Sequence, residues 1–396
     1  MDLSFPSELR SFAEEVRAFV RAELPPAMRE KVKLNRSDFA EDRLVWQRKL
    51  VAKGWAAPTW PVAYGGTNWD VLKRYVYSEV MADEYAPAPI PFGQTMLAPV
   101  LLQFGTEEQR QHYLPRILTL EYFFCQGFSE PGAGSDLASL KTSAVQDGDY
   151  WVINGQKTWT SAAHHANMIF CLVRTDPNAK KPQEGISMLI FPLDLPGITI
   201  RPIITLDSER HVNETFFDNV RVHKSCMIGE PNLGWTYAKA LLGFERHEIA
   251  RIGLCKRWLR QLKETAAQTQ RAGTPLSEHP YFRNKIAKAE IDLKALEMLN
   301  LRMLSNMARN LPGNEANMLK IRGSELQQTM TELRLEIGGA NSLRYERDGL
   351  EVPEIFDDVD YHGDIAATYF MNRVVTIYGG SNEIQRNVLA KSFLEL

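Results

Sequence analysis

Residues 129–136 read Ser-Glu-Pro-Gly-Ala-Gly-Ser-Asp and lie where the chain changes from a helical to an extended pattern. Glycine and proline at this density predict a loop whose backbone can approach a ligand closely. Ser129 and Ser135 add hydroxyl donors, and exposed N–H groups of such a loop suit phosphate or ring carbonyl oxygens. Gly-rich loops are common, so the stretch alone does not separate a ligand loop from a plain turn.

The patterns on either side divide the chain into three zones. Apolar residues recur at helical spacing over residues 1–119, with helices predicted at 72–86 and 107–117. In residues 120–230, short apolar or alternating runs lie between turn signals. The predicted strands are 150–153, 168–173, 186–191 and 198–203. Helical patterns return over 231–396, the first nearly uninterrupted across 234–270. The order predicts an α+β multidomain protein: an N-terminal helical domain, a compact middle β-barrel or sandwich, and a C-terminal helical bundle.

Composition limits the class of protein. The chain has 396 residues, 44% hydrophobic and 24% charged, which is typical of a globular protein. A net charge of −3 gives no indication of nucleic-acid binding, and no apolar run is long enough to span a membrane. The eight histidines form no metal-binding cluster, so no metal is expected. Four widely spaced cysteines and an N-terminus without a signal peptide predict a cytoplasmic protein.

A second candidate segment runs from Asn154 to Ser161. Asn154-Gly155 is a typical hairpin turn sequence. A strand after this turn would place Trp159 and Ser161 on one face, because side chains alternate along a strand. A large aromatic plane beside a hydroxyl suits a planar heteroaromatic cofactor. A core tryptophan next to a surface serine is the alternative interpretation.

The third candidate segment is residues 377–386, which read Ile-Tyr-Gly-Gly-Ser-Asn-Glu-Ile-Gln-Arg. Two glycines precede a helix whose N-cap is expected to be Ser381 or Asn382. Helix N-termini attract phosphate and other electron-rich groups. An ordinary capped helix also accounts for this segment when it is considered alone.

Together, the three segments resemble the signatures of the acyl-CoA dehydrogenase family in order and spacing across nearly the whole chain. Members of this family have an N-terminal helical domain, a middle β-barrel and a C-terminal four-helix bundle. They bind FAD and oxidise an acyl-CoA to the trans-2-enoyl-CoA. The chain most resembles bacterial proteins described as the large subunit of pimeloyl-CoA dehydrogenase. Applied to this chain, the resemblance implies domains at 1–119, 120–230 and 231–396.

The resemblance also implies a set of ligand contacts. Ser135 matches a position that contacts CoA, and Ser161 preserves a hydroxyl donor where the family usually has Thr. Gly338-Gly339 resembles a pair that borders the FAD of a neighbouring subunit. The implied cofactor-binding residues are Gln126, Phe128, Ser129, Trp159, Ser161, Gly338, Gly339, Ser381 and Glu383.

The base for the reaction needs a separate argument. Removing the α-proton of a thioester requires a carboxylate that faces the flavin across the acyl chain. Many family members carry this Glu just after the Tyr of the C-terminal motif, where this chain has Gly379. A minority carry it just before an Arg on a long bundle helix, and Glu245-Arg246 matches that position. The resemblance therefore implies Glu245 as the base, Arg246 as a substrate contact and the Gly379 N–H as a donor to the thioester oxygen.

The apolar neighbours of Glu245 fit this role. They stand at −4, −3, +4 and +7 from it and share its predicted helix face; they are Leu241, Leu242, Ile249 and Ile252. A carboxylate on an apolar stripe is unfavourable unless it is paired or functional, and partial burial would raise its pKa. The alternative is a helix glutamate in an ion pair with Arg246 or His247.

The expected partners are an acyl-CoA, an electron-transferring flavoprotein or similar acceptor, and other subunits of a tetramer. His279 and Leu335 depart from the family pattern at positions that normally touch FAD across a subunit interface, as expected in a heterotetramer with a related subunit. A homo-oligomer stays open. So do two other functions: a non-catalytic flavin- or CoA-binding subunit, and an oxygen-using acyl-CoA oxidase or flavin monooxygenase. The subgroup suggests a dicarboxylyl-CoA substrate, with sterol side-chain, branched and linear fatty acyl-CoA of β-oxidation as alternatives.

Overall fold

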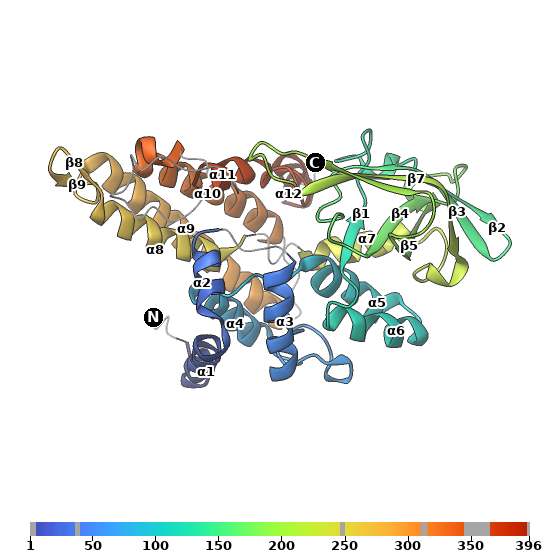
Figure 1. Ribbon diagram of the computed structural model, residues 1–396, viewed down its shortest axis with the longest axis horizontal. Coiled ribbons are helices and arrows are strands. Elements are labelled where there is room, and N and C mark those ends of the chain that lie inside the picture. Colours follow the sequence, from blue (N-terminus) through green and yellow to red (C-terminus); the bar gives the residue numbers. More distant parts are fainter. Residues whose placement is uncertain (1–4, 36–39, 246–249, 310–314, 344–364, 394–396) are drawn as a thin grey trace. The chain divides into compact units, whose positions relative to one another are not determined.

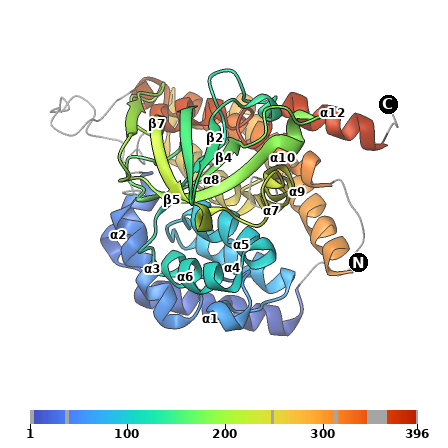
Figure 2. The same ribbon diagram turned by 90° about the vertical axis from the view of Figure 1, so that its right-hand side faces the viewer.

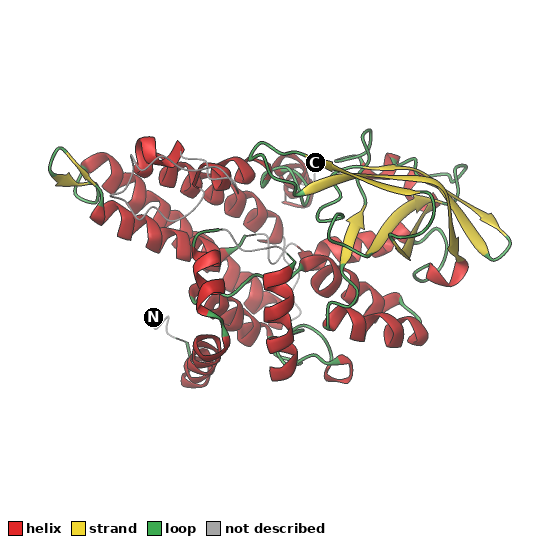
Figure 3. Cartoon of the chain, in the orientation of Figure 1, coloured by secondary structure: helices red, strands yellow, loops and turns green. Residues whose placement is uncertain are grey.

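The computed structural model describes residues 5–35, 40–245, 250–309, 315–343 and 365–393. The chain forms two compact units (Figures 1 and 3). The helical unit contains Met1–Trp46, Trp69–Ala88 and Arg246–Leu396. The β unit contains Gln47–Asn68 and Pro89–Glu245.

The N-terminal helices of the helical unit follow the predicted periodicity. They are α1 (Ser7–Glu23), α2 (Pro26–Lys33), the start of α3 (Glu41–Lys53) and α4 (Val71–Asp83). Helix α1 buries Leu9, Val16 and Val20, which form one stripe at helical spacing. Helix α4 begins where the Asp70 carboxylate accepts the N–H groups of Leu72 and Lys73, both at 2.8 Å. The helix predicted at 72–86 is therefore confirmed.

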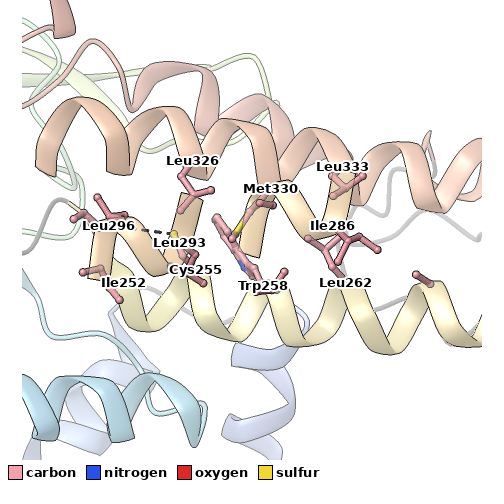
Figure 4. Packing of buried hydrophobic residues seen from close by; sticks show 14 of the residues in the cluster. Ile252, Cys255, Trp258, Leu262, Ile286, Leu293, Leu296, Leu326, Met330 and Leu333 are labelled. Atoms are coloured by element: carbon pink, nitrogen blue, oxygen red, sulfur yellow. Dashed lines mark hydrogen bonds between the residues drawn. The ribbon is translucent and has the colours of Figure 1, made fainter. Parts of the chain in front are cut away.

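Helices α8 (Ile252–Gln268), α9 (Pro280–Ala308) and α10 (Glu315–Gly338) pack around one hydrophobic core (Figure 4). Residues three or four apart on each of these helices point into this core, as expected for amphipathic helices. Helices α11 (Ile365–Met371) and α12 (Asn382–Phe393) pack against α10. The core residues labelled in Figure 4 are Ile252, Cys255, Trp258, Leu262, Ile286, Leu293, Leu296, Leu326, Met330 and Leu333. A short hairpin, β8 (Gln270–Arg271) and β9 (Thr274–Pro275), separates α8 from α9.

A seven-stranded sheet forms most of the β unit (Figures 1 and 2). Its strands are β1 (Phe124–Gly127), β2 (Ser143–Asp147), β3 (Tyr150–Lys157), β4 (Met168–Arg174), β5 (Ile186–Pro192), β6 (Ile198–Ile203) and β7 (Val212–His223). The strand order is β1-β4-β2-β3-β7-β6, with β5 antiparallel to β4. Buried side chains occupy almost every position of β4 and β5. The α+β fold class is confirmed, and β7 is a long strand that the sequence patterns did not predict.

The remaining elements of the β unit are helical. They are the C-terminal part of α3, η1 (Val62–Tyr64), η2 (Phe92–Leu97), α5 (Ala98–Phe104), α6 (Glu107–Leu118), η3 (Leu137–Ser139), η4 (Pro182–Gly185), η5 (Lys224–Cys226) and α7 (Gly234–Glu245). Helix α6 agrees with the helix predicted at 107–117, and a reciprocal capping box between Thr106 and Gln109 fixes its start. Among the described residues, no helix has the length and apolarity needed to cross a membrane.

The hairpin turn predicted at Asn154-Gly155 is wrong. Strand β3 continues through both residues and pairs with β2 on one side and β7 on the other. A β-bulge shifts the β3–β7 register between Ile153 and Gly155, and the Asn154 side chain accepts the N–H of Asn219 at 2.8 Å. Gly155 has φ +145° and lies so close to Thr142 that an added Cβ would stand 2.7 Å from its Cα. Here the glycine allows a bulge and a close approach, so it does not turn the chain.

The nearly uninterrupted helix predicted across 234–270 is divided into two helices. Helix α7 ends at Glu245, helix α8 begins at Ile252, and Arg251 has a left-handed backbone with φ 45°. Residues 246–249, including Ile249, lie outside the described residues. Ile252 therefore belongs to α8 and not to the helix face of Glu245. Of the residues predicted on the apolar face of Glu245, Leu241 is fully buried in α7 and Leu242 is half-buried.

Candidate functional site

Two sequence segments that were predicted separately meet in the β unit. The loop after β1 carries Phe128 and Ser129, and Trp159 follows the end of β3. The Thr158 N–H donates to the Ser129 carbonyl at 2.9 Å. Ser129 and Trp159 therefore stand on backbone segments that are hydrogen-bonded to each other, as a shared ligand site requires.

Residues 158–162, here called the Trp159 strap, pair with the chain around the start of β7. The Thr160 N–H donates to the Asn213 carbonyl at 2.9 Å, and the Ala162 N–H donates to the His211 carbonyl at 2.9 Å. The hydrogen bonds use alternate residues of the strap. Within the described part of the chain, the N–H groups of Trp159 and Ser161 donate to no residue.

Side chains of the strap alternate in the same way. Thr158, Thr160 and Ala162 are buried, whereas Trp159 is 60% exposed and Ser161 is half-buried. The predicted placement of Trp159 and Ser161 on one side thus agrees with their exposure. The strand that was expected to carry them nevertheless ends at Lys157, before the strap.

The backbone of Trp159 is unusual for an aromatic residue. It adopts φ 57°, in the left-handed region that costs a residue with a Cβ about 1–2 kcal/mol. Such a conformation persists only where the neighbouring residues enforce it, and it points to a functional role. Hydrogen bonds at Thr158 and Thr160 hold the strap on both sides of Trp159. Together they present a large aromatic face, an apolar surface suited to stacking on a planar ligand.

The loop 129–136 is a tight turn followed by an exposed stretch. Glu130 and Ala133 exchange two backbone hydrogen bonds, each of 3.0 Å. Ser135 is exposed, as a contact to a bound ligand would require. The Glu130 side chain points inward, where its carboxylate accepts the N–H groups of Lys141 at 2.7 Å and Thr142 at 2.8 Å. The loop therefore has a hydrogen-bonded turn at Glu130–Ala133 and a solvent-exposed stretch after it.

Burial alone would raise the pKa of Glu130, but the ion pair with Lys157 and the hydrogen bonds from Thr142 and Lys141 outweigh it and lower that pKa below its ordinary 4.5. The Lys157 ammonium is 2.8 Å from the Glu130 carboxylate. Glu130 is accordingly ionised at neutral pH.

Asn213 connects the strap to a pair of histidines. Its fully buried side chain donates to the Thr160 carbonyl at 2.9 Å and also contacts Nδ1 of His164 at 3.1–3.2 Å. The rings of His164 and His165 lie 4.1 Å apart. Partial burial, followed by the proximity of His165, lowers the pKa of His164. Neutral His164 can accept a hydrogen bond from the Asn213 side-chain amide, and Asn213 in turn holds the Trp159 strap at the Thr160 carbonyl.

Glu245 is the last described residue of α7 before residues 246–249. Its side chain and all of Arg246 lie outside the described residues. Their predicted roles as base and substrate contact therefore stay predictions.

The C-terminal motif is built on a second left-handed turn. Gly379 has φ 65° and Gly380 has φ 80°, and the side-chain amide of Gln385 donates to both of their carbonyls, at 3.4 and 3.3 Å. Glycine is the residue that adopts such values without strain. Among the described residues, none accepts a hydrogen bond from the Gly379 N–H. That N–H is free to bind a ligand oxygen.

Ser381 is the N-cap of α12, as one of the two alternatives predicted. Its hydroxyl accepts the N–H of Ile384 at 3.4 Å, and its carbonyl accepts the N–H of Gln385 at 2.9 Å. Glu383 stands exposed in the first turn, where hydrogen bonding to its own N–H and to Ser381 lowers its pKa. A helix N-terminus with its partial positive charge is thus present at the expected position.

A buried lysine fixes this motif. Lys320 of α10 is fully buried, and its ammonium donates to the Val375 carbonyl and the Asn382 side-chain oxygen, both at 3.0 Å. Ser324 donates to the same oxygen at 3.1 Å. The segment that carries Gly379 is therefore held at both ends against α10.

The glycine pair Gly338-Gly339 stands apart from this motif. It ends α10, 14 residues beyond Ser324, which is about 21 Å along a helix. The Gly338-Gly339 pair and Ser381 therefore cannot hold the same part of one small ligand within a single chain. That separation fits the expectation that the pair borders the FAD of a neighbouring subunit. His279 is exposed and precedes α9, and Leu335 is half-buried. Their predicted position near FAD at a subunit interface stays a prediction.

Sequence patterns missed Lys157, Asn213 and Lys320 as parts of the site. Lys320 stands between two buried residues, Leu319 and Ile321, so its place in an apolar stretch of α10 was a usable signal. Lys157 and Asn213 carried no such signal, because their acceptors come from distant segments.

Comparison with known proteins assigns the chain to a family. Three family models match: acyl-CoA dehydrogenase N-terminal domain over residues 6–121, middle domain over 125–220 and C-terminal domain over 232–394. The chain belongs to the acyl-CoA dehydrogenase family. The predicted family is thus confirmed, and the protein is an enzyme of this class.

Relatives and solved structures match along most of the chain. Acyl-CoA dehydrogenase IpdE1 of Mycobacterium tuberculosis (strain ATCC 25618 / H37Rv) is 37% identical over 358 residues, which cover 90% of this chain and 88% of that protein. The structure described as Tcur3481-Tcur3483 steroid ACAD is 33% identical, with a TM-score of 0.85, and covers 100% of this chain and 99% of that chain. The ChsE4-ChsE5 complex from Mycobacterium tuberculosis is 29% identical, with a TM-score of 0.83 and the same coverage.

Proposed function

We propose that this protein catalyses the FAD-dependent α,β-dehydrogenation of an acyl-CoA thioester, with Glu245 as the base for the α-proton. The observation that carries the proposal is the Trp159 strap. It presents an exposed aromatic face, two N–H groups without a partner among the described residues, and the Ser161 hydroxyl. These features lie in a chain whose family is FAD-dependent in general.

The residues present fit an isoalloxazine ring. Such a ring offers a flat face for stacking on Trp159 and a polar edge for the N–H groups and hydroxyls of the strap and of Ser129. Gln126 and Phe128 would line the same loop. Bound FAD would supply the acceptor for the hydride that leaves the β-carbon. Ser381 and Glu383 would add contacts at the α12 N-terminus, and Gly338-Gly339 would serve the FAD of a neighbouring subunit.

Removal of the α-proton requires a side chain of the protein. Position 379 is glycine, so the motif offers no carboxylate after Tyr378. Glu245 remains as the base, on helix α7, which buries Leu241. The Gly379 N–H would bind the thioester oxygen and stabilise the enolate-like charge that develops when the α-proton leaves. Ser135 and Arg246 would contact the CoA portion and the substrate.

We propose a steroid-derived acyl-CoA as the substrate class. The support is the 33% identity, over the full chain, to a structure described as a steroid ACAD. This choice replaces the dicarboxylyl-CoA expected from the subgroup resemblance, which stays the alternative in the substrate test. Electrons would pass to an electron-transferring flavoprotein or a similar acceptor in the cytoplasm.

A heteromeric assembly is the second part of the proposal. One of the similar structures is a complex of two named chains, ChsE4 and ChsE5. That precedent favours a tetramer with a related subunit. The departures of His279 and Leu335 from the family pattern favour it as well. It also favours a second candidate function, that of a non-catalytic subunit that completes a partner's site. An oxygen-using oxidase would differ by consuming oxygen without an added acceptor.

The test is to purify the chain, alone and co-expressed with a related acyl-CoA dehydrogenase chain, and to record the flavin spectrum. Steroid-derived, dicarboxylyl and linear acyl-CoA are then added without oxygen. The proposal expects bleaching of the flavin, fastest with the steroid-derived thioester. A colourless preparation in both cases would overturn it. Equal bleaching by wild type and a Glu245→Gln variant, seen only when the related chain is present, would instead favour the non-catalytic role for this chain.

A further inference from the structure

Lys157 is among the largest fully buried side chains of the protein. Lysine is almost never fully buried unless its charge is paired, because removing an ammonium from water is strongly unfavourable. Lys157 is the last residue of β3 and stands directly before the Trp159 strap. Its burial therefore needs an explanation at the edge of the candidate flavin site.

The Lys157 ammonium has two acceptors, and both belong to the loop after β1. It donates to the Phe128 carbonyl at 3.1 Å and to the Glu130 carboxylate at 2.8 Å. These acceptors flank Ser129, whose own carbonyl accepts the Thr158 N–H at 2.9 Å. Three consecutive residues of the loop are thus bonded to two consecutive residues of the β3 end.

Glu130 also connects this loop to a third segment of the chain, at Lys141 and Thr142. Its two oxygens also accept the N–H groups of Lys141 and Thr142. The carboxylate therefore has an ammonium and two backbone donors as partners, and its exposed fraction is 8%. A satisfied buried network of this kind fixes one geometry, whereas a partly satisfied one is unstable.

We infer that Lys157 is a positioning residue that sets the distance between the Ser129 loop and the Trp159 strap, and so shapes the site for the flavin ring. The inference rests on the proposed function, because it assumes that Ser129 and Trp159 contact FAD. Lys157 itself would not touch the cofactor. It acts through the Phe128 carbonyl and Glu130 on one side and through Thr158 and Trp159 on the other.

The experiment compares two changes at the buried pair with one at an exposed pair. Lys157→Met removes the donor, and the double variant Lys157→Met/Glu130→Gln also removes the charge that would be left unpaired, in case the single variant does not fold. Lys224→Met is the matched control. Lys224 pairs with Asp149 at 2.7 Å in the same unit, with both side chains more than half exposed.

Two measurements are made on the full chain. The first is amide hydrogen exchange without FAD at Glu130, Thr158 and Thr160, which reports local opening of the two segments. The second is the FAD dissociation constant together with the shape of the visible flavin spectrum. In the double variant, we expect exchange at these amides and the FAD dissociation constant to rise about 10- to 100-fold, the range for losing a buried hydrogen-bond partner. Lys224→Met should leave both unchanged.

The inference is overturned if the folded double variant keeps wild-type exchange at these three amides and wild-type FAD affinity. A uniform rise of exchange over the whole β unit would also overturn it, because that is the result of a merely stabilising ion pair. If wild type binds no FAD, the proposed function fails, and the flavin part of the inference fails with it. The exchange measurement still decides whether Lys157 couples the two segments.

Discussion

The Lys157 ammonium lies 2.8 Å from the Glu130 carboxylate, with side-chain exposed fractions of 0% and 8%. This ion pair joins two segments that are far apart in the sequence, the loop after β1 and the end of β3. Each segment carries a residue proposed to contact FAD, Ser129 on one and Trp159 on the other. The candidate site is thus held together by contacts between segments that are distant in the sequence, a design that keeps functional groups in place.

Replacing Trp159 should separate cofactor binding from stability. Trp159→Gly removes an exposed ring and gives φ 57° to a residue that adopts it freely, so the free energy of unfolding should change by less than about 1 kcal/mol. The FAD dissociation constant should rise roughly tenfold through lost stacking. Denaturant unfolding and FAD titration measure the two effects. Trp60→Ala is the control: Trp60 is 1% exposed, and its loss should reduce stability by about 3–5 kcal/mol.

Acid should weaken the β unit through Glu130. The pKa of Glu130 is lower in the folded protein than its ordinary 4.5. The stability it contributes is therefore fully present above that value and is lost as the pH falls through the lower, folded-state pKa. Unfolding free energies of wild type and Glu130→Gln, measured across this acidic range, should converge as the pH falls. A constant gap between the two curves would contradict this prediction.

Lys320 should stabilise the C-terminal motif. Lys320→Met removes the donor to the Val375 carbonyl and to Asn382, which should reduce stability by about 1–3 kcal/mol. Exchange of the Asn382 N–H, which donates to the Thr376 carbonyl, should quicken. Lys288→Met, at an exposed position of α9, should stay within about 0.5 kcal/mol. Similar losses in the two variants would show that burial of Lys320 is unimportant.

The bulge in β3 can be tested at Gly155. An added Cβ would stand 2.7 Å from Cα of Thr142, in a backbone with φ +145°, so Gly155→Ala should reduce stability by about 1–3 kcal/mol. Gly134→Ala is the control, since nothing lies within 4 Å of its added Cβ and its φ is not positive. Thermal unfolding with equal midpoints for both variants would argue against the close approach at Gly155.

Sequence patterns predicted several elements within a few residues. Helices α4 and α6 agree with the predicted ranges because one buried face sets their periodicity. Strands β4, β5 and β6 also agree, and β4 and β5 are buried at almost every position. The hairpin turn predicted at Asn154-Gly155 is wrong because an Asn-Gly pair favours a turn only through its local conformation. Pairing of β3 with both β2 and β7 is non-local and outweighs that preference.

The site was predicted in part, for the same physical reason. The exposed aromatic at Trp159 and the N-cap at Ser381 are local features that a motif carries. The role of Lys157 depends on acceptors 27 and 29 residues away along the chain, and that of Lys320 on acceptors 55 and 62 residues away. No local pattern reveals such partners, although the apolar neighbours of Lys320 were a usable signal of its burial.

The central claim is that Glu245 removes the α-proton of an acyl-CoA in a flavin enzyme. The direct measurement is the rate of flavin bleaching when a steroid-derived acyl-CoA is mixed without oxygen with wild type, Glu245→Gln or the exposed control Glu230→Gln. We predict that all three carry FAD, that wild type and Glu230→Gln bleach alike, and that Glu245→Gln bleaches about 10²–10⁴-fold more slowly. Bleaching of Glu245→Gln at the wild-type rate would contradict the account.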